Sequence, residues 1–135
     1  MKRFLAVLAY VLPTFPLGYF WHLTVFAGYY KDLAVYRDDM VIPFGLASML
    51  IQGFAWAIVY EKMFGGEPVV RGSFRFFLVA FPIAWSYMVL AVAAKHHMAS
   101  VGGYLLIETA FVVIHFAIVS PLIAFVYARP RTTIV

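Results

Sequence analysis

A glutamate inside an apolar stretch is the residue of this sequence best placed to do chemistry. Glu108 is the only acidic residue within the four long apolar stretches of the 135-residue chain. An ionised carboxylate in a bilayer interior is costly, and such residues face partners or a hydrated cavity. We therefore expect basic side chains of neighbouring segments to shield Glu108 from lipid.

Three basic residues lie at a depth that matches Glu108. His22 lies near the end of the first stretch, and Lys95 and His96 follow the third. We predict a polar cluster of Glu108, His22 and Lys95 or His96. The cluster could be a proton-coupled or cation-binding site, because burial and a neighbouring base tune the proton affinity of a carboxyl group. The alternative is an ion pair that fixes how the helices pack.

A second polar position lies in the middle of the last stretch, at His115. We expect His115 to form a hydrogen bond with Gln52 or Ser48, which lie at a comparable depth in the second stretch. Both belong to a stripe of small and polar residues at steps of three and four, which starts at Gly45 and ends at Ala55. The stripe is either a close helix contact with an interhelical hydrogen bond or the lining of a ligand site.

The four histidines raise the alternative of a haem or metal protein. Bis-histidine haem ligation requires a second histidine at the depth of His115, whereas His22, His96 and His97 all lie nearer one end of the bundle. A metal ion held by these three histidines and Glu108 is the other form of this alternative. We predict no cofactor and no metal.

The sequence contains none of the common catalytic signatures. The absence of cysteine excludes disulfides, thiolate metal sites and cysteine nucleophiles. P-loop, Rossmann and nucleophile-elbow motifs are absent as well. We expect a protein that is not an enzyme, with one alternative: a small lipid-acting enzyme using Glu108 and His22 as acid and base near the headgroups.

The elements that must position these residues are membrane-spanning helices. The chain is 65% hydrophobic and 12% charged, a composition that a soluble domain of this size does not have. The apolar stretches cover residues 4–27, 40–60, 74–94 and 101–128, and each has about the 20 residues that a helix needs to cross a bilayer. We predict an all-α, integral membrane four-helix bundle that forms a single transmembrane domain over residues 1–135.

Turn and cap residues agree with four helices. Ser73 and Ser100 are suitable N-caps for the third and fourth helices. Pro43 falls in the first turn of the second helix, where its missing N–H costs little. Tyr29, Tyr30 and Tyr36 are typical anchors at a membrane surface, so we expect the 28–39 segment to be a loop at that surface.

The distribution of positive charge predicts the orientation of the chain. One side of the predicted bundle carries seven of the ten Lys and Arg residues, namely Lys2, Arg3, Lys62, Arg71, Arg75, Arg129 and Arg131. The positive-inside rule places this side and both termini in the cytoplasm. The net charge of +4 is then a topology signal and not a nucleic-acid surface. We expect the first span to remain uncleaved, since its apolar stretch is longer than that of a signal peptide.

A weak internal repeat suggests a duplicated helical hairpin. Residues 15–19 resemble residues 81–85, and residues 57–60 resemble residues 124–127, at offsets of 66 and 67. Two hairpins of the same orientation would be related by an axis along the membrane normal. Chance similarity among apolar residues is the alternative.

Short polar motifs in all four spans resemble those of a known group. They are Trp21-His22-Leu23, Gln52-Gly53, Ala93-Ala94-Lys95-His96 and Glu108-Thr109-Ala110-Phe111. They are similar to the signature of a group of small four-span bacterial membrane proteins with no assigned activity. The resemblance implies a bacterial inner-membrane location and no particular substrate. Small multidrug exporters share this size, but their essential glutamate lies in the first span, where this chain has none.

These observations lead to a functional expectation. We expect a multi-pass protein that is either an accessory or structural subunit or a carrier of a small solute or ion, with its polar site around Glu108. Its expected partners are the lipid bilayer and a second copy or another membrane subunit, because four short helices enclose little volume. A membrane haem or redox-handling protein is the alternative.

Overall fold

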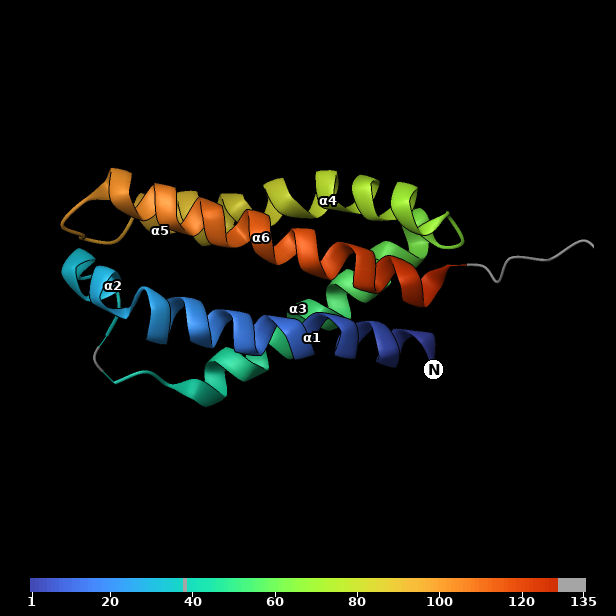
Figure 1. The fold of residues 1–135 in the computed structure, drawn as a ribbon, viewed down its shortest axis with the longest axis horizontal. Helices are drawn as coiled ribbons and strands as arrows, with labels where there is room; N and C mark the ends of the chain where they lie inside the picture. Colours follow the sequence, from blue (N-terminus) through green and yellow to red (C-terminus); the bar gives the residue numbers. More distant parts are fainter. Residues whose placement is uncertain (38, 129–135) are drawn as a thin grey trace, which may run out of the picture.

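The computed structural model describes residues 1–37 and 39–128, and confirms an all-helical fold among them. Four helices are long and apolar enough to cross a membrane, at Lys2–Val25, Ile42–Phe64, Val69–Ala93 and Val101–Tyr127 (Figure 1). In chain order the elements are α1 (Lys2–Phe20), the π-helical turn η1 (Trp21–Val25), α2 (Ala27–Leu33), α3 (Ile42–Phe64), α4 (Val69–Trp85), the π-helical turn η2 (Ser86–Leu90), α5 (Ala91–Ala93) and α6 (Val101–Tyr127).

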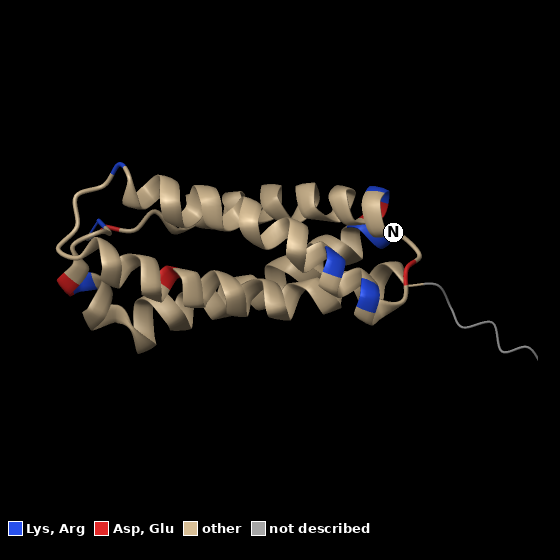
Figure 2. Cartoon of the chain, turned by 90° about the horizontal axis from the view of Figure 1, so that it is seen from above, with Lys and Arg blue, Asp and Glu red and all other residues tan. Residues whose placement is uncertain are grey.

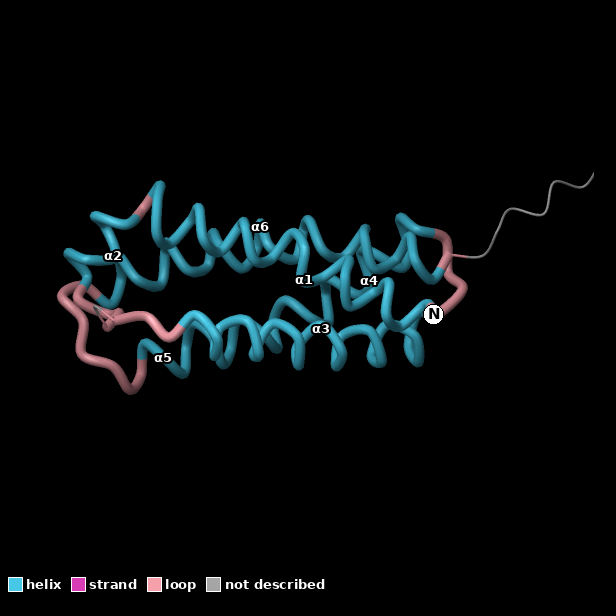
Figure 3. The backbone as a smooth tube through the Cα atoms, turned by 90° about the horizontal axis from the view of Figure 1, so that it is seen from below, coloured by secondary structure: helices cyan, strands magenta, loops and turns pink. Residues whose placement is uncertain are grey.

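The long helices run between two ends of an elongated bundle. The N-terminus, the turn between α3 and α4 and the last turn of α6 share one end, called here the N-terminal end (Figure 1). The opposite end, called the α2 end, holds α2 and the loops that precede α3 and α6, as Figure 3 shows. α1 packs against α3 and α6, and α4 packs against α6, which is the arrangement of two neighbouring hairpins.

Aromatic residues fill the half of the bundle nearer the N-terminal end. Trp56 makes edge-on contacts with Phe76 and Phe116 at ring-centroid distances of 5.8 Å each. Tyr60 packs edge-on against Phe76 at 5.3 Å and stacks on Tyr127 at 5.4 Å. Offset and edge-on pairs at these distances are the favourable geometries for aromatic rings, so these rings form a packed core in this half of the bundle.

α3 crosses α1 at a glycine and then diverges from it. A Cβ atom added at Gly53 would lie 3.2 Å from the ring of Tyr10 and 3.5 Å from the side chain of Val11, so a larger residue there would push against the Tyr10 ring. Toward the α2 end α3 leaves the bundle, and Phe44 in its first turn is 76% exposed. The divergence of α1 and α3 opens the space in which the polar residues lie.

The helix ends match the sequence expectations in part. Ser100 caps α6, because its hydroxyl accepts a hydrogen bond from the Gly103 N–H at 3.1 Å. The prediction of Ser73 as an N-cap is wrong: α4 begins one turn earlier, directly after Pro68, whose ring fixes a suitable φ of −55°. The 28–39 segment is not all loop either, since α2 continues to Leu33 and ends where Ala34 adopts a left-handed φ of 54°.

The two hairpins share a backbone feature that agrees with the sequence repeat. In the first helix of each hairpin an internal proline, Pro16 or Pro82, is followed within about a turn by a π-helical segment. Such π turns are rare and occur frequently at functional sites. Both lie in the half of the bundle nearer the α2 end, where Glu108 also lies.

Basic residues gather at the N-terminal end, as Figure 2 shows. Arg3 binds Glu61 at 2.5 Å, and Arg75 forms an ion pair with Glu67. Arg129 and Arg131, which were counted toward the same side, lie outside the described residues. The orientation in the membrane, with both termini in the cytoplasm, stays a prediction.

Candidate functional site

Glu108 lies on the buried face of α6, which packs against α1 and α4. Buried residues recur along α6 every three or four positions, as one face of a helix requires, and they are Tyr104, Glu108, Phe111, Val112, His115, Phe116, Val119, Ser120, Ile123, Ala124 and Tyr127. Only 3% of the Glu108 surface is exposed. The carboxyl group is therefore shielded from lipid and must be satisfied by other side chains.

His22 reaches Glu108 from the π turn that follows α1. The regular ladder of hydrogen bonds four residues apart is interrupted in η1. Nδ1 of His22 lies 2.9 Å from the carbonyl oxygen of Gly18, and Nε2 lies 3.1 Å from Oε1 of Glu108. The contact between Glu108 and His22 that the sequence predicted is present in the structure.

The partners of His22 determine where the protons of the pair lie. A backbone carbonyl can only accept, so the Gly18 contact assigns a hydrogen to Nδ1. Nε2 of His22 and Oε1 of Glu108 then share one further proton, either as imidazolium beside carboxylate or as imidazole beside carboxylic acid. Both forms are neutral overall, and a neutral pair is far less costly in an apolar surrounding than a lone charge.

Two tyrosines complete the surroundings of the Glu108 carboxyl group. The Tyr36 hydroxyl donates to Oε1 of Glu108 at 2.9 Å, and its ring stacks on Tyr30 with centroids 5.0 Å apart. The Tyr30 hydroxyl accepts from Nε1 of Trp21 at 3.2 Å. Burial, and then the nearby Glu108 carboxyl group, raise the pKa of both tyrosines well above its ordinary value. Both phenols therefore keep their protons at physiological pH.

Lys95 and His96 do not join this cluster. Both side chains are exposed in the segment between α5 and α6. The segment packs on α2 instead, where the Ala99 N–H donates to the Leu33 carbonyl at 3.0 Å. Tyr36 occupies the position at Glu108 that we had expected one of the two basic residues to take.

A metal site was one alternative for the same histidines. His96 and His97 are exposed and stand apart from the pair formed by His22 and Glu108. In residues 1–37 and 39–128, no three His, Asp or Glu side chains lie close enough together to hold a metal ion.

His115 is the centre of a second polar group. Its Nε2 lies 2.8 Å from the hydroxyl oxygen of Thr14, which in turn lies 2.5 Å from the carbonyl oxygen of Tyr10. The single hydroxyl hydrogen of Thr14 must go to that carbonyl, so Nε2 of His115 carries a hydrogen and donates to Thr14. Nδ1 of His115 is then a bare acceptor, and it is buried with no partner among the described residues.

The prediction that His115 bonds to Gln52 or Ser48 is wrong. Oε1 of Gln52 accepts from the Tyr10 hydroxyl at 2.7 Å, and its Nε2 donates to Ser48 at 2.9 Å. The physical reason is the position of α1, which packs against α6 on one side and α3 on the other. Tyr10 and Thr14 of α1 therefore take the bonds that were assigned to a direct contact between α3 and α6.

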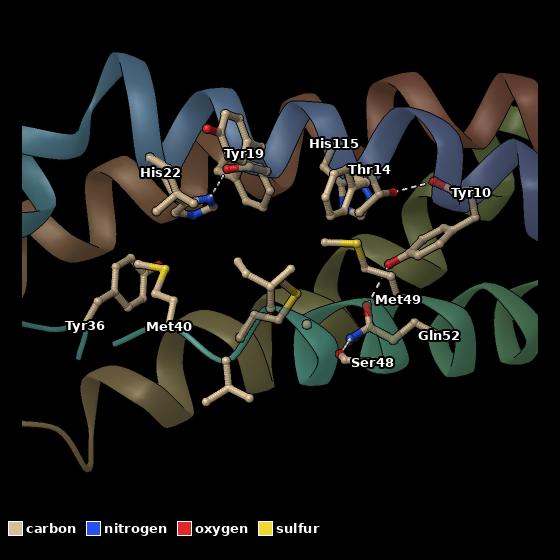
Figure 4. A pocket seen from close by; sticks show the side chains of 18 of the residues that line it. Tyr10, Thr14, Tyr19, His22, Tyr36, Met40, Ser48, Met49, Gln52 and His115 are labelled. Carbon is tan, nitrogen blue, oxygen red and sulfur yellow. Dashed lines mark hydrogen bonds between the residues drawn. The ribbon is translucent and has the colours of Figure 1, made fainter. Parts of the chain in front are cut away.

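A cavity of about 410 Å³ connects the two polar groups. The first span lines it with Tyr10, Thr14 and Gly18 of α1 and His22 of η1, which follow one another at steps of four. Figure 4 shows the side chains of Tyr10, Thr14 and His22 on one side of the cavity and those of Ser48, Met49 and Gln52 of α3 on the other. Tyr36 and Met40 lie at one end. From Tyr10 to His22 the cavity is about 18 Å long, at 1.5 Å of helix rise per residue.

The small and polar stripe of α3 has both roles that the sequence suggested. Gly45, Ser48 and Gln52 line the cavity, and Gln52 also forms the hydrogen bond to Tyr10 of α1. Three residues of the stripe thus line the cavity, and Gln52 also holds α3 to α1 through one interhelical hydrogen bond.

Sequence reasoning missed three residues of the site: Tyr36, Tyr10 and Thr14. The sequence predicts Tyr36 to be a membrane-surface anchor, and 39% of its surface is exposed. Its hydroxyl nevertheless reaches Glu108. Tyr10 and Thr14 precede His22 on the same face of α1 at steps of four. That spacing was the available signal, since polar residues on one face of an apolar helix point to a common partner or cavity.

No protein-family model matches the chain, and no curated protein and no solved structure is significantly similar to it.

Proposed function

We propose that this chain is a non-enzymatic, multi-pass protein of a bacterial inner membrane that binds a small amphipathic molecule in the cavity between α1 and α3. It acts as a carrier of that molecule or as the subunit that holds it within a membrane complex. The resemblance to small four-span bacterial proteins supports the location, and the four apolar helices support the multi-pass arrangement.

The observation that carries the proposal is the continuity between the cavity and the buried acid. His22 and Tyr36 both line the cavity and both form hydrogen bonds with Glu108. An ion pair that only holds two helices together does not require a cavity next to it. A volume of about 410 Å³ with largely apolar walls and a few convergent polar groups is typical of a small-molecule site.

The first half of α3 supports entry from the membrane. Gly45 and Ser48 line the cavity but are exposed to the surroundings of the bundle, as is nearly every residue from Val41 to Leu50. The cavity therefore has a side that faces lipid. We propose the bilayer as the source of the ligand, and a second copy or a partner subunit as the neighbour needed for a complete path across the membrane.

A cavity-blocking variant tests the proposal. The probe is the neutral amphiphile N-phenyl-1-naphthylamine, whose fluorescence rises in apolar surroundings, added to purified protein in lipid nanodiscs. Gly45→Trp is chosen to fill the cavity, because Gly45 lines it and a Cβ atom added there meets no atom within 4 Å. Phe44→Trp is the matched control, since Phe44 neighbours Gly45 but does not line the cavity.

The expected result is saturable binding by the wild type and by Phe44→Trp, with binding by Gly45→Trp at least about tenfold weaker. Empty nanodiscs give the partition background. Equal binding by both tryptophan variants, or no saturable binding by any of the three proteins, would overturn the proposed function.

A further inference from the structure

The unpaired groups of the cavity wall point to one chemical class of ligand. We propose that the cavity binds an organic ammonium ion, and that each ammonium bound displaces the proton shared by His22 and Glu108. This inference rests on the proposed ligand-binding function and adds to it the charge of the ligand and a one-for-one exchange with a proton.

The wall groups that lack a partner are hydrogen-bond acceptors. His115 lines the cavity, and its buried Nδ1 has a lone pair and no partner among the described residues. Glu108 becomes a second acceptor once the shared proton leaves, because Nδ1 of His22 keeps its own hydrogen on the Gly18 carbonyl. Buried acceptors favour a ligand that donates, and an alkylammonium group offers up to three N–H donors.

The positive charge of the ligand follows from the charges that the cavity contains. Arg37 is the only Lys or Arg among its lining residues in the described part of the chain. The Arg37 guanidinium is tied to Asp39 by two hydrogen bonds of 2.9 Å. The one guanidinium among the described lining residues is therefore already paired, whereas the carboxyl group of Glu108 lies directly behind His22, which lines the cavity.

Aromatic rings surround His22 and favour the same class of ligand. The rings of Phe111, Tyr30 and Tyr36 lie 4.5, 4.8 and 5.8 Å from the imidazole, measured between centroids. Tyr19 and Phe15 add aromatic surface to the cavity wall. Aromatic faces attract ammonium ions, and the attraction is strongest where water is excluded.

The exchange balances in protons and in charge. Before binding, His22 and Glu108 share one proton and the pair is neutral. The ammonium ion keeps its own protons and donates to Nε2 of His22 and Oε1 of Glu108, while the shared proton leaves to water at the α2 end. The occupied site contains one carboxylate and one ammonium, so it is again neutral, and no lone charge is left in the membrane.

The other ionisable groups around the pair do not supply the proton. Tyr30 of α2 and Tyr36 of the following loop have a raised pKa and stay protonated. Tyr104, one turn before Glu108 on α6, donates its hydroxyl hydrogen to the Met88 carbonyl next to α4 at 3.0 Å. Within the described residues, His22 is the only basic side chain paired with Glu108. One exchangeable proton is therefore expected for each binding event.

Calorimetry measures this stoichiometry directly. Decylammonium, decanol and decanoate are titrated into wild-type protein in nanodiscs, in two buffers with different enthalpies of protonation. The difference in apparent binding enthalpy between the buffers gives the number of protons released. Decylammonium is expected to release about one proton per site and to bind at least about tenfold more tightly than the other two probes. Lowering the pH by one unit, where the pair is protonated, should weaken its binding about tenfold.

Variants separate the failure of this inference from the failure of the proposed function. Glu108→Gln should lose proton release and most of the preference for decylammonium, while binding of N-phenyl-1-naphthylamine by the wild type and by Gly45→Trp tests the cavity function separately. Equal binding of decanol and decylammonium by the wild type with no proton release, or tighter binding of decanoate, would overturn the ammonium inference and leave the cavity function intact. The wild-type measurements decide the matter even if Glu108→Gln does not fold.

Discussion

Nε2 of His22 and Oε1 of Glu108 lie 3.1 Å apart, although 86 positions separate the two residues in the chain. The contact joins the first membrane-spanning helix to the last one. It forms where the π turn η1 interrupts α1 and where α6 turns its buried face toward α1. The pair therefore joins these two helices inside the bundle.

Replacing Glu108 by glutamine should leave the fold nearly intact, whereas alanine should not. A glutamine amide nitrogen in the place of Oε1 can donate to Nε2 of His22, which reproduces that bond of the uncharged pair. It cannot also accept from Tyr36, which contacts the same atom, but Tyr36 is 39% exposed and its hydroxyl can bind water instead. We expect Glu108→Gln to change the free energy of unfolding by less than about 1 kcal/mol, and Glu108→Ala to cost about 3 kcal/mol, because it leaves two buried groups unpaired. Thermal unfolding in detergent compares the variants, and equal losses for both would contradict the neutral-pair assignment.

Alkaline pH should destabilise the protein through Tyr30. Burial, and then Glu108, raise the pKa of Tyr30 above its ordinary value of 10.0, and only 2% of the residue is exposed. The folded state then holds the phenolic proton that the unfolded state releases above pH 10, so the stability is present below pH 10 and is lost as the pH rises further. The expected loss is at most about 1.4 kcal/mol per pH unit for this residue.

Unfolding measured at pH 9 and pH 11 tests this dependence. Tyr30→Phe should reduce the alkaline loss of stability, because phenylalanine has no proton to release. Tyr29→Phe is the control, as Tyr29 is the exposed neighbour of Tyr30. The interpretation fails if both variants lose the same stability between the two pH values as the wild type.

The pairing of Glu108 with His22 could be predicted from the sequence. In antiparallel spans of similar length, the depth of a residue in the bilayer can be counted from the ends of its helix. Distance along the helix from the nearest end places both side chains at about the same level. The four spans were predictable for the same kind of reason, since length and apolarity alone determine whether a helix can cross a bilayer. The N-cap role of Ser100 could be predicted from the local preference for serine at helix N-termini.

The remaining parts of the site depend on geometry that has no local signal. Tyr36 reaches Glu108 because the loop after α2 folds back toward the bundle, and sequence spacing does not give the path of a loop. The partner of Gln52 depends on where α3 crosses α1, which is decided by the contact of Gly53 with Tyr10. The π turns likewise arise within continuous apolar helices, so the sequence showed only the prolines that precede them.

The crossing of α1 and α3 should depend on the absence of a side chain at position 53. A Cβ there meets the Tyr10 ring at 3.2 Å, whereas a Cβ at Gly45 meets nothing within 4 Å. We expect Gly53→Leu to destabilise the protein by about 2 kcal/mol through overpacking. Gly45→Leu, the matched substitution in the same helix, should change the unfolding temperature little, and equal effects of the two would argue against the crossing point.

The predicted orientation can be tested with single cysteines, because the chain has none of its own. Asp32→Cys places a thiol in α2, and Val70→Cys places one at the N-terminal end of the bundle; both positions are exposed. If the positive-inside rule holds, a membrane-impermeant maleimide labels Asp32→Cys from the periplasmic side of spheroplasts. Val70→Cys should react only after the membrane is permeabilised, and the reverse pattern would invert the orientation.

The tautomer of His115 should make the protein sensitive to the Thr14 hydroxyl. Thr14→Val keeps the shape of the side chain but removes the oxygen that accepts from Nε2 of His115. A buried N–H without an acceptor costs about 1 to 3 kcal/mol, so Thr14→Val should lower the free energy of unfolding by that amount. Thr14→Ser retains the hydroxyl and should recover most of the loss.

If the bond ran the other way, with Thr14 as donor, His115 would have a free N–H at Nδ1 and not a lone pair. Nitrogen NMR shifts of the His115 ring distinguish the two tautomers, and a hydrogen on Nδ1 would remove the acceptor that the ligand assignment uses.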